Sequence, residues 1–467
     1  MLDIVEKTLK YAEKISDYVE VRAENAESNK IIFKNSNVEI VDSTRTIGLC
    51  VRLLKNGALG AAFTNNFNLS KIKKTINEAI KMAKSSRKNL KKQITLSKEK
   101  SNKGSYEVKG EIKLKNVNLE DKIKELIELD KELLSTKLNI PARFFELSDE
   151  IREKCYSNSD GSFVYSKIPR IGLEYLISLV SNGLSQQRMF QLGGAGGWEI
   201  FRNWDLNKRI INEAKILSKI LKARKSPKGK FNVILSPELI GIASHESCGH
   251  PYEADRILGR EAAQAGESFI TRQMLGKRIG SSIVNLVDDP TVKGSYGFYL
   301  YDDEGVRAQK RFLIKNGKIN TFLHNRETAA EFGVKSNASS RASNWSYEPI
   351  VRMANTFVLP GNHSFDELID VKKGVYIKSY MEWNIDDKRF NQRYVGLESY
   401  LIRNGKIENL IKRPIIEITT PAFWQSVDAI GNDLEFTAGT CGKSEPMQGV
   451  PVWFGGPHIR LKNIRLG

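Results

Sequence analysis

A short segment that joins a helix start to paired histidines constrains this chain more than any other feature. Residues 236–255 read S-P-E-L-I-G-I-A-S-H-E-S-C-G-H-P-Y-E-A-D. Ser236 is suited to cap a helix, Pro237 to occupy its first position and Glu238 to lie in its first turn. An apolar stripe then follows at helical spacing, formed by Leu239, Ile242 and Ala243. We expect a helix here with one face held against a core.

The residues after this stripe form the pattern H-E-x-x-x-H, with His245, Glu246 and His250. It is one residue longer than the H-E-x-x-H pattern of zinc proteases. Residues five apart in a regular helix point about 140° apart, so the two imidazoles would not meet on one ion. Gly249 weakens a helix, and Pro251 disfavours helical backbone at the residue before it. We therefore expect His245 and Glu246 on the last helical turn, and His250 on an unwound, kinked segment just after it.

Two histidines do not complete a zinc site, because zinc normally takes three protein ligands and, when catalytic, leaves a fourth position for water. Spacing alone leaves the third ligand open among two thiols and two carboxylates: Cys248, Cys441, Glu253 and Asp255. The alternative is that the histidines make ordinary hydrogen bonds at a helix end. Histidine is rare in this chain, with five in 467 residues, which argues against a chance pattern.

Several segments resemble the TldD/PmbA family of metallopeptidases, in the TldD branch that retains the metal motif. They are residues 244–255, 301–309, 352–356, 439–444 and 448–452, with a weaker likeness at 47–52. The resemblance implies that His245, His250 and Cys441 hold zinc, that Glu246 is the general base and that Cys248 is a packed thiol. It also implies a dimer, either of two copies or with a paralogue that lacks the motif, with the site enclosed between the subunits.

One loop departs from the family pattern. The family usually has a Gly-Gly-Gln-Val-Asp-like run before its last hairpin, whereas residues 381–388 read M-E-W-N-I-D-D-K. If this loop lines the substrate cleft, we expect a substrate preference that differs from that of better-known members.

Other polar residues are weaker candidates. His324 and Arg326 are candidates for binding an oxyanion or a peptide carboxylate, and they are interpreted equally well as surface polar residues. Residues 302–304, an Asp-Asp-Glu triplet, are typical either of a second cation site or of a tight turn that ends at Gly305. The two remaining histidines we interpret as structural: His363 and His458.

Composition fits a chain of two or three globular domains, with 40% hydrophobic residues. No run of 18 apolar residues predicts a membrane span, and the charged N-terminal helix lacks the apolar block of a secretion signal. We therefore predict a cytoplasmic location, where four cysteines are better interpreted as thiols or ligands than as disulfides. The net charge of +18 would suit a nucleic-acid partner, but much of it lies in one lysine-rich segment, so we favour a solvated surface.

The predicted fold class is α+β, with an N-terminal α/β lobe and a β-rich C-terminal lobe that carries the metal-binding helix. The predicted domains are 1–84, a basic linker at 85–118, a middle α/β domain at 119–224 and a metallopeptidase domain at 231–467. Strands are expected at 18–23, 30–33, 161–166 and 173–180 among others. Asn-Gly pairs predict three tight hairpins, within 47–63, 313–319 and 401–407.

The functional hypothesis is a zinc metallopeptidase that hydrolyses peptides or unfolded proteins, with Glu246 as general base. An extended substrate would add to an exposed strand edge of the β-rich lobe. Two alternatives stay open at this point. One is a binding or regulatory protein with a structural metal, which would need a fourth protein ligand. The other is a nucleic-acid-associated modulator, suggested by the charge alone.

Overall fold

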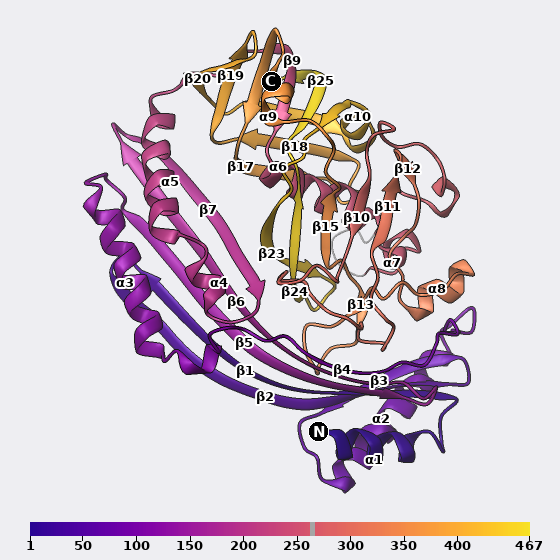
Figure 1. The fold of residues 1–467 in the computed structure, drawn as a ribbon. Helices are drawn as coiled ribbons and strands as arrows, with labels where there is room; N and C mark the ends of the chain where they lie inside the picture. The colour runs from indigo at the N-terminus through magenta and orange to yellow at the C-terminus, as the bar shows by residue number, and fades with distance from the viewer. Residues whose placement is uncertain (262–266) are drawn as a thin grey trace.

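The protein has two lobes of mixed α and β structure, which confirms the predicted α+β class (Figure 1). The structure is a computed structural model that describes residues 1–261 and 267–467. One long curved sheet dominates the N-terminal lobe. Two further sheets and the predicted metal-binding helix make up the C-terminal lobe.

The N-terminal sheet has seven strands in the order β3-β2-β1-β5-β6-β4, with β7 also paired to β6. It consists of β1 (Tyr18–Lys34), β2 (Asn37–Lys55), β3 (Ala58–Thr64), β4 (Lys103–Glu107), β5 (Ala142–Asn158), β6 (Phe163–Ser181) and β7 (Leu184–Ala195). The strands expected at 18–23 and 30–33 form one continuous strand, as do those expected at 161–166 and 173–180. The residues between these two expected strands stay in register with β2 and β5, and Glu24 among them is buried against basic side chains.

This sheet draws strands from both sides of the predicted basic linker. β4 lies within 85–118 and pairs in parallel with β6, so part of this lysine-rich segment belongs to the sheet. Helices α1 (Leu2–Ala12) and α2 (Leu69–Arg87) pack at one end of the sheet, and α3 (Leu119–Ser135) and α5 (Leu206–Leu221) at the other (Figure 1). Each pair covers its own cluster of buried apolar residues.

All three Asn-Gly hairpins are confirmed. Asn56 and Gly57 connect β2 to β3 with φ values of 53° and 72°, the positive values that a type I′ turn requires. The other two turns, Asn316-Gly317 and Asn404-Gly405, also have positive φ at both positions. These turns were predictable because their conformation depends on the two residues themselves.

The C-terminal lobe contains a ten-stranded sheet, a six-stranded sheet and a two-stranded one. The ten-stranded sheet is formed by β8 (Arg224–Lys225), β9 (Gly229–Leu235), β16 (Lys373–Ile377), β17 (Tyr380–Ile385), β18 (Asn391–Gly396), β19 (Ser399–Arg403), β20 (Lys406–Lys412), β21 (Ile415–Thr419), β22 (Val427–Ile430) and β25 (Ile459–Leu466). The six-stranded sheet is formed by β10 (Leu286–Asp288), β11 (Arg311–Lys315), β12 (Lys318–Ile319), β15 (Asn355–Val358), β23 (Glu435–Lys443) and β24 (Gln448–Gly456). The small sheet pairs β13 (Ser340–Arg341) with β14 (Ile350–Val351).

The short helices of this lobe are α6 (Pro237–Ser244), α7 (Ala254–Ile257), α8 (Arg326–Phe332), α9 (Phe365–Ile369) and α10 (Thr420–Gln425). Its main apolar core draws on α6 and on both large sheets. The predicted metal-binding helix therefore lies in the middle of the lobe.

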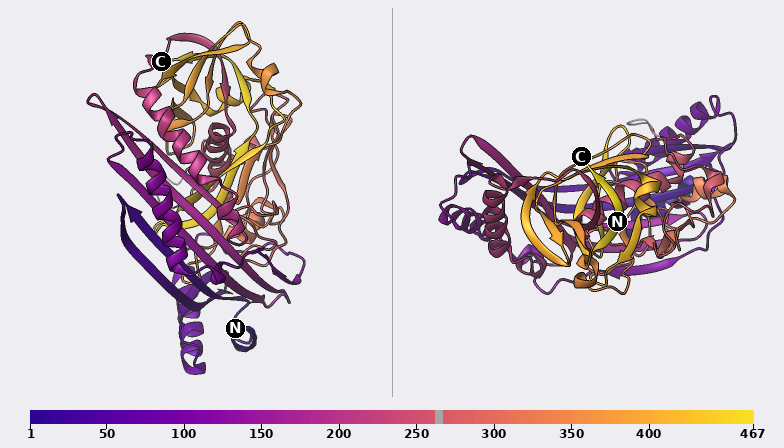
Figure 2. Two further views of the ribbon diagram at one scale, coloured as in Figure 1. Left: turned by 60° about the vertical axis from the view of Figure 1, so that its left-hand side comes forward. Right: turned by 90° about the horizontal axis from the view of Figure 1, so that it is seen from above.

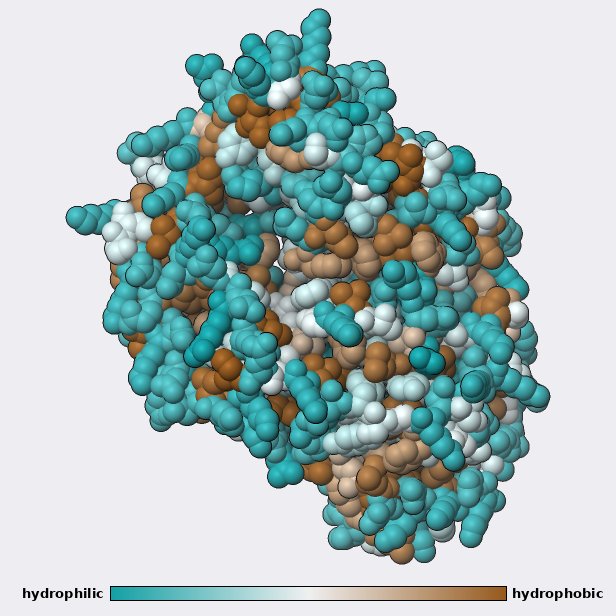
Figure 3. Space-filling view, viewed as in Figure 1, coloured by the Kyte–Doolittle hydropathy of each residue, from teal (hydrophilic) through white to brown (hydrophobic). Residues whose placement is uncertain are grey.

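The curved N-terminal sheet holds the C-terminal lobe against its inner face (Figures 1 and 2). Polar contacts cross this boundary. Lys154 Nζ lies 2.8 Å from Asp303 Oδ1, and Arg170 donates to the carbonyl of Phe298 over 2.9 Å. The outer parts of the face seen in Figure 3 are mostly hydrophilic, as expected for a chain with 73 lysines and arginines. Within the described residues, no helix is both long enough and apolar enough to cross a membrane.

Candidate metal centre

Helix α6 begins as the sequence predicts. Ser236 caps it, because its hydroxyl accepts the N–H of Leu239 over 3.4 Å, and Pro237 occupies the first position. The burial differs from the expectation of a single apolar face, since every residue of α6 but Glu238 is buried. The helix is enclosed because β15, β23 and β24 pack against it and its apolar residues belong to the main core of the lobe.

A single wide turn brings the two histidines together. The α-helix ends at Ser244, and His245–Gly249 form a π-helical turn in which the N–H of His250 donates to the carbonyl of His245. This hydrogen bond between residues i and i+5 places side chains five residues apart on the same side of the turn. The imidazole rings of His245 and His250 accordingly lie 5.0 Å apart, centroid to centroid, at an angle of 80°. The meeting of the imidazoles was predicted, but not the π-helical turn that produces it.

The backbone of His250 corrects one expectation. Its φ and ψ of −55° and −46° are helical, so Pro251 does not push it out of the helical region. In an α-helix the Pro251 ring would clash with the carbonyl of Ser247, and the wider turn removes that conflict. Gly249 also has a role beyond weakening a helix, because a Cβ atom there would overlap Sδ of Met353.

The structure brings together the three ligand candidates that the family resemblance named. His245, His250 and Cys441 are all buried, and one potential ligand atom from each lies within 4.8 Å of the others. Cys441 reaches this point from β23, and its Sγ is 3.4 Å from Nε2 of His250. Phe454 of the neighbouring strand β24 packs against the His245 ring, with 5.7 Å between ring centroids. The cluster is therefore enclosed by protein.

Glu253 sets the orientation of His250. Its Oε2 lies 3.1 Å from Nδ1 of His250, which leaves Nε2 facing Cys441. Arg256 and Lys443 surround the same carboxylate at 3.1 and 3.2 Å. Burial alone would raise the pKa of Glu253, but Lys443 and His250 outweigh this and hold it well below its ordinary value. A carboxylate on the outer nitrogen of a metal-binding histidine is a recurrent arrangement in zinc sites.

The electrostatics favour the metal-binding form of two cluster members. Burial lowers the pKa of His245, so its ring is held neutral. For Cys441, burial opposes ionisation, but the charges of His250 and Arg352 outweigh it and lower the pKa to about 7. A neutral imidazole and a thiolate are the forms that bind metal. For Cys248, in contrast, burial raises the pKa of the thiol.

Glu246 lies beside the cluster and has one charged contact that the sequence did not suggest. Its Oε2 accepts from Nη1 of Arg389 over 2.8 Å, and the Glu246 side chain is 8% exposed. Arg389 is 143 residues away in the chain, in the loop between β17 and β18. The same hairpin contains residues 381–388, the segment that departs from the family pattern.

The chain matches three domain models of one known family. Residues 228–467 match the PmbA/TldA metallopeptidase C-terminal domain, residues 19–83 match domain 1 and residues 112–221 match the central domain. The chain belongs to the TldD/PmbA metallopeptidase family. It is therefore a metalloprotease, as predicted.

Curated relatives of this family member support the assignment over its full length. A metalloprotease of Methanocaldococcus jannaschii is 34% identical over 460 residues, which cover 98% of each chain. A zinc metalloprotease TldD homolog of Saccharolobus solfataricus is 28% identical over 75% of this chain and 77% of its own. In fold, the chain resembles TldE from Thermococcus kodakarensis, with a TM-score of 0.76 at 17% identity over 99% of this chain and all of that one. A Thermotoga maritima protein is similar, with a TM-score of 0.80 at 17% identity over all of both chains.

The residues present fit a zinc ion. At ordinary zinc bond lengths and tetrahedral angles, a bound sulfur and a bound nitrogen are about 3.6 Å apart. The 3.4 Å between Cys441 Sγ and His250 Nε2 is close to that value. Nδ1 of His245 is buried without a hydrogen-bond partner in the described part of the chain. Two imidazoles and a thiolate are a donor set that zinc accepts.

The other ligand candidates are engaged elsewhere. Asp255 accepts a hydrogen bond from Nζ of Lys443 over 2.8 Å, and Glu253 contacts Nδ1 of His250. Cys248 lies outside the cluster, with its Sγ 3.8 Å from the Ser247 hydroxyl. In the described residues, no fourth protein ligand completes the group.

The weaker candidates have other partners. Burial lowers the pKa of His324 to about 4, and its ring packs against Phe332, with 5.0 Å between centroids. Arg326 donates to the Tyr18 hydroxyl and to Asp160, at 2.7 and 2.8 Å. The carboxylates of 302–304 accept main-chain N–H groups or face basic side chains, as a turn requires.

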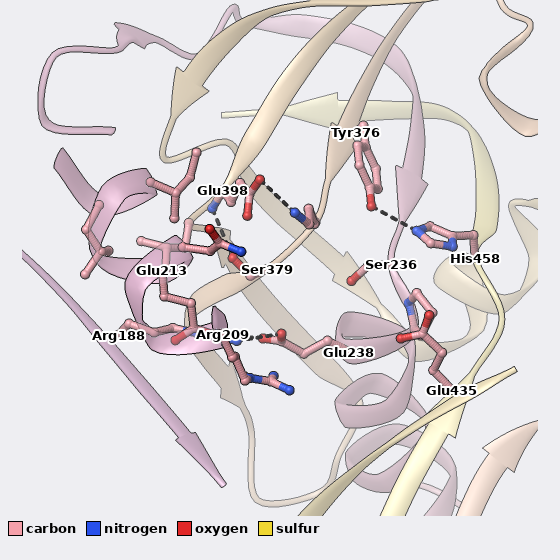
Figure 4. A pocket seen from close by; sticks show the side chains of 16 residues that line it. Arg188, Arg209, Glu213, Ser236, Glu238, Tyr376, Ser379, Glu398, Glu435 and His458 are labelled. Atoms are coloured by element: carbon pink, nitrogen blue, oxygen red, sulfur yellow. Dashed lines mark hydrogen bonds and ion pairs between the residues drawn. The ribbon is translucent and has the colours of Figure 1, made fainter. Parts of the chain in front are cut away.

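A cavity of about 530 Å³ lies at the opposite end of α6 from the cluster (Figure 4). The ion pair of Arg188 with Glu238, at 2.7 Å, runs along one side of it. His458 lines another side, with its Nε2 2.9 Å from the Tyr376 hydroxyl. His245, His250 and Cys441 are not among the residues that line it. The remaining histidine, His363, has its Nδ1 3.2 Å from the carbonyl of Ile430.

Proposed function

We propose that this metalloprotease hydrolyses peptide bonds in peptides or unfolded proteins, with a zinc ion held by His245, His250 and Cys441. The observation that carries the proposal is the convergence of these three side chains within 4.8 Å, next to Glu246. When bound, zinc polarises the scissile carbonyl and lowers the pKa of water. The printed name of the Saccharolobus solfataricus relative, a zinc metalloprotease, supports the choice of metal.

Glu246 acts as the general base in this proposal. It takes a proton from the attacking water and later gives that proton to the leaving amine. Cys441 lies on β23, which forms one end of the six-stranded sheet. An extended peptide binds along a strand edge of this lobe through main-chain hydrogen bonds, which favour broad specificity.

The proposed partner is the one that the family resemblance implies: a second copy of this chain, or a paralogue that lacks the motif. The fold likeness to TldE supports only the common architecture of the two chains. Light scattering of the purified protein, alone and mixed with a motif-lacking paralogue, distinguishes a homodimer from a heterodimer. A monomer in both samples would contradict the proposal.

Glu246→Gln separates a catalytic zinc from a structural one. We expect the variant to retain one zinc per chain and to lose about 100-fold or more of the peptidase kcat, because general bases contribute roughly that much. The measurement is zinc content by elemental analysis together with cleavage of an unfolded protein, with and without chelator. Full activity in Glu246→Gln would instead support the structural-metal alternative.

A further inference from the structure

The cation closest to the proposed base comes from a distant hairpin. Arg389 Nη1 lies 2.8 Å from Oε2 of Glu246, and the Arg389 side chain is only 14% exposed. Its Nε is buried and has no acceptor among the described residues. The guanidinium thus keeps a donor free beside a group that would exchange a proton during hydrolysis.

The hairpin loop holds Arg389 in a fixed position. Asp386 accepts the main-chain N–H groups of Phe390 and Asn391, at 2.7 and 3.0 Å. The carbonyl of Arg389 accepts the Thr420 hydroxyl at 2.8 Å. Arg389 itself has a φ of 64°, in the left-handed region that an arginine seldom adopts.

This backbone belongs to the hairpin turn, in which the N–H of Arg389 donates to the carbonyl of Asp386 over 2.9 Å. With these hydrogen bonds in place, Arg389 resembles a preorganised positive charge, which stabilises negative charge without having to rearrange.

The geometry points to Arg389 as the group that binds the oxyanion formed during peptide hydrolysis at this centre, an inference that rests on the proposed function. Water oxygen bonds to the carbonyl carbon, the C=O π pair moves onto oxygen, and the water proton goes to Glu246. The oxyanion's electron pair then re-forms the C=O bond, the C–N bond breaks with its electron pair on nitrogen, and the proton of Glu246 passes to that nitrogen. During the first step negative charge leaves Glu246 and appears on the oxyanion.

Arg389 is placed to follow that charge. Before the reaction it neutralises the Glu246 carboxylate, and after proton transfer that partner is neutral. The planar guanidinium of Arg389 can then donate to the oxyanion that has formed beside Glu246. A lysine would supply the charge without the fork, so the two side chains are not equivalent here.

The test compares Arg389→Ala and Arg389→Lys with the zinc-loaded wild type. We expect Arg389→Ala to lower kcat by about 100-fold with little change in KM, the size of effect seen when one oxyanion donor is removed. Arg389→Lys should recover part of the loss, and free guanidinium should partly rescue Arg389→Ala. The matched control is Arg403→Ala on another hairpin of the same sheet, because Arg403 is exposed and pairs with Glu408 at 3.5 Å.

Binding supplies a second readout that does not depend on turnover. A tetrahedral phosphinic peptide should bind Arg389→Ala about 100-fold more weakly than wild type, in proportion to the kcat loss, because it mimics the oxyanion. An unreactive peptide with a planar amide should bind both alike. Zinc content and the urea midpoint report whether Arg389→Ala is still folded. If it is not, the same binding comparison is made between Arg389→Lys and wild type.

Two results would overturn the proposal. One is a kcat of Arg389→Ala within threefold of wild type, and the other is unchanged affinity for the phosphinic peptide. Failure of the proposed function is a different outcome, namely wild-type protein that binds zinc but cleaves no peptide. In that case the phosphinic-peptide comparison still decides whether Arg389 binds a tetrahedral anion.

Discussion

At the scale of single residues, Glu253 shows how one carboxylate connects metal binding to stability. It contacts the outer nitrogen of His250, and it also lies against the buried cations Arg256 and Lys443. The sequence suggested Glu253 as a ligand, because it is close to the motif. The orientation of the Glu253 carboxylate depends on Lys443, which is 190 residues further along the chain. No local sequence pattern predicts that contact.

We expect Glu253→Gln to weaken zinc binding by about 10- to 100-fold, since the partners of metal-bound histidines contribute roughly that much. Asp255→Asn is the matched control, because Asp255 also pairs with Lys443 but does not touch His250. Both variants should lose stability, whereas only Glu253→Gln should lose zinc affinity. Competition with a chromophoric zinc chelator measures this, and equal affinities in the two variants would contradict the role assigned to Glu253.

At the scale of elements, the start of α6 was predictable and its end was not. Ser236 and Pro237 act through their own backbone and side chain, so the sequence alone predicts the cap. The π-helical turn depends on what packs over it. Met353 occupies the space beside Gly249, so the reason for that glycine lies 104 residues downstream of it.

Gly249→Ala tests whether this packing maintains the turn. The added methyl group would overlap Sδ of Met353, so we expect the free energy of unfolding to fall by about 1–3 kcal/mol, the usual cost of overpacking. Met353→Ala alone should cost about 2–5 kcal/mol by leaving a cavity. The double variant should lose less than the sum of the two, because the new methyl group fills part of that cavity. Urea unfolding of the zinc-free proteins measures the cycle, and strict additivity would refute the idea.

At the scale of the whole molecule, the sequence predicted two lobes but not the continuous sheet that joins distant parts of the first. Pairing of β1 with β5 joins segments on both sides of the lysine-rich stretch 85–118, and pairing of β4 with β6 makes part of that stretch a strand of the sheet. Such long-range pairing has no local signature. The same holds for the boundary between the lobes, where Asp303 of the C-terminal lobe meets Lys154 and Arg22 of the sheet, at 2.8 and 3.7 Å.

This boundary should make the stability of the molecule depend on pH. Burial alone would raise the pKa of Asp303, but Lys154 and Arg22 outweigh it and hold the pKa below its ordinary value. A carboxyl group with a lowered folded-state pKa contributes stability that is complete above its unfolded pKa of about 3.9. That contribution is lost as the pH falls further, towards the folded-state pKa.

We therefore expect Asp303→Asn to unfold about 2 kcal/mol more easily than wild type at pH 7, because it removes one of the two carboxylates that face Arg22 and Lys154 and leaves them only Glu24. The difference should narrow as the pH falls below about 4, where wild type loses the same charge. Urea unfolding at several pH values between 7 and 3.5 measures it. Glu128→Gln, which removes an exposed pair with Lys131, should change stability by less than about 0.5 kcal/mol at pH 7. A difference between Asp303→Asn and wild type that stays constant to pH 3.5 would show that the charge of Asp303 does not hold the two lobes together.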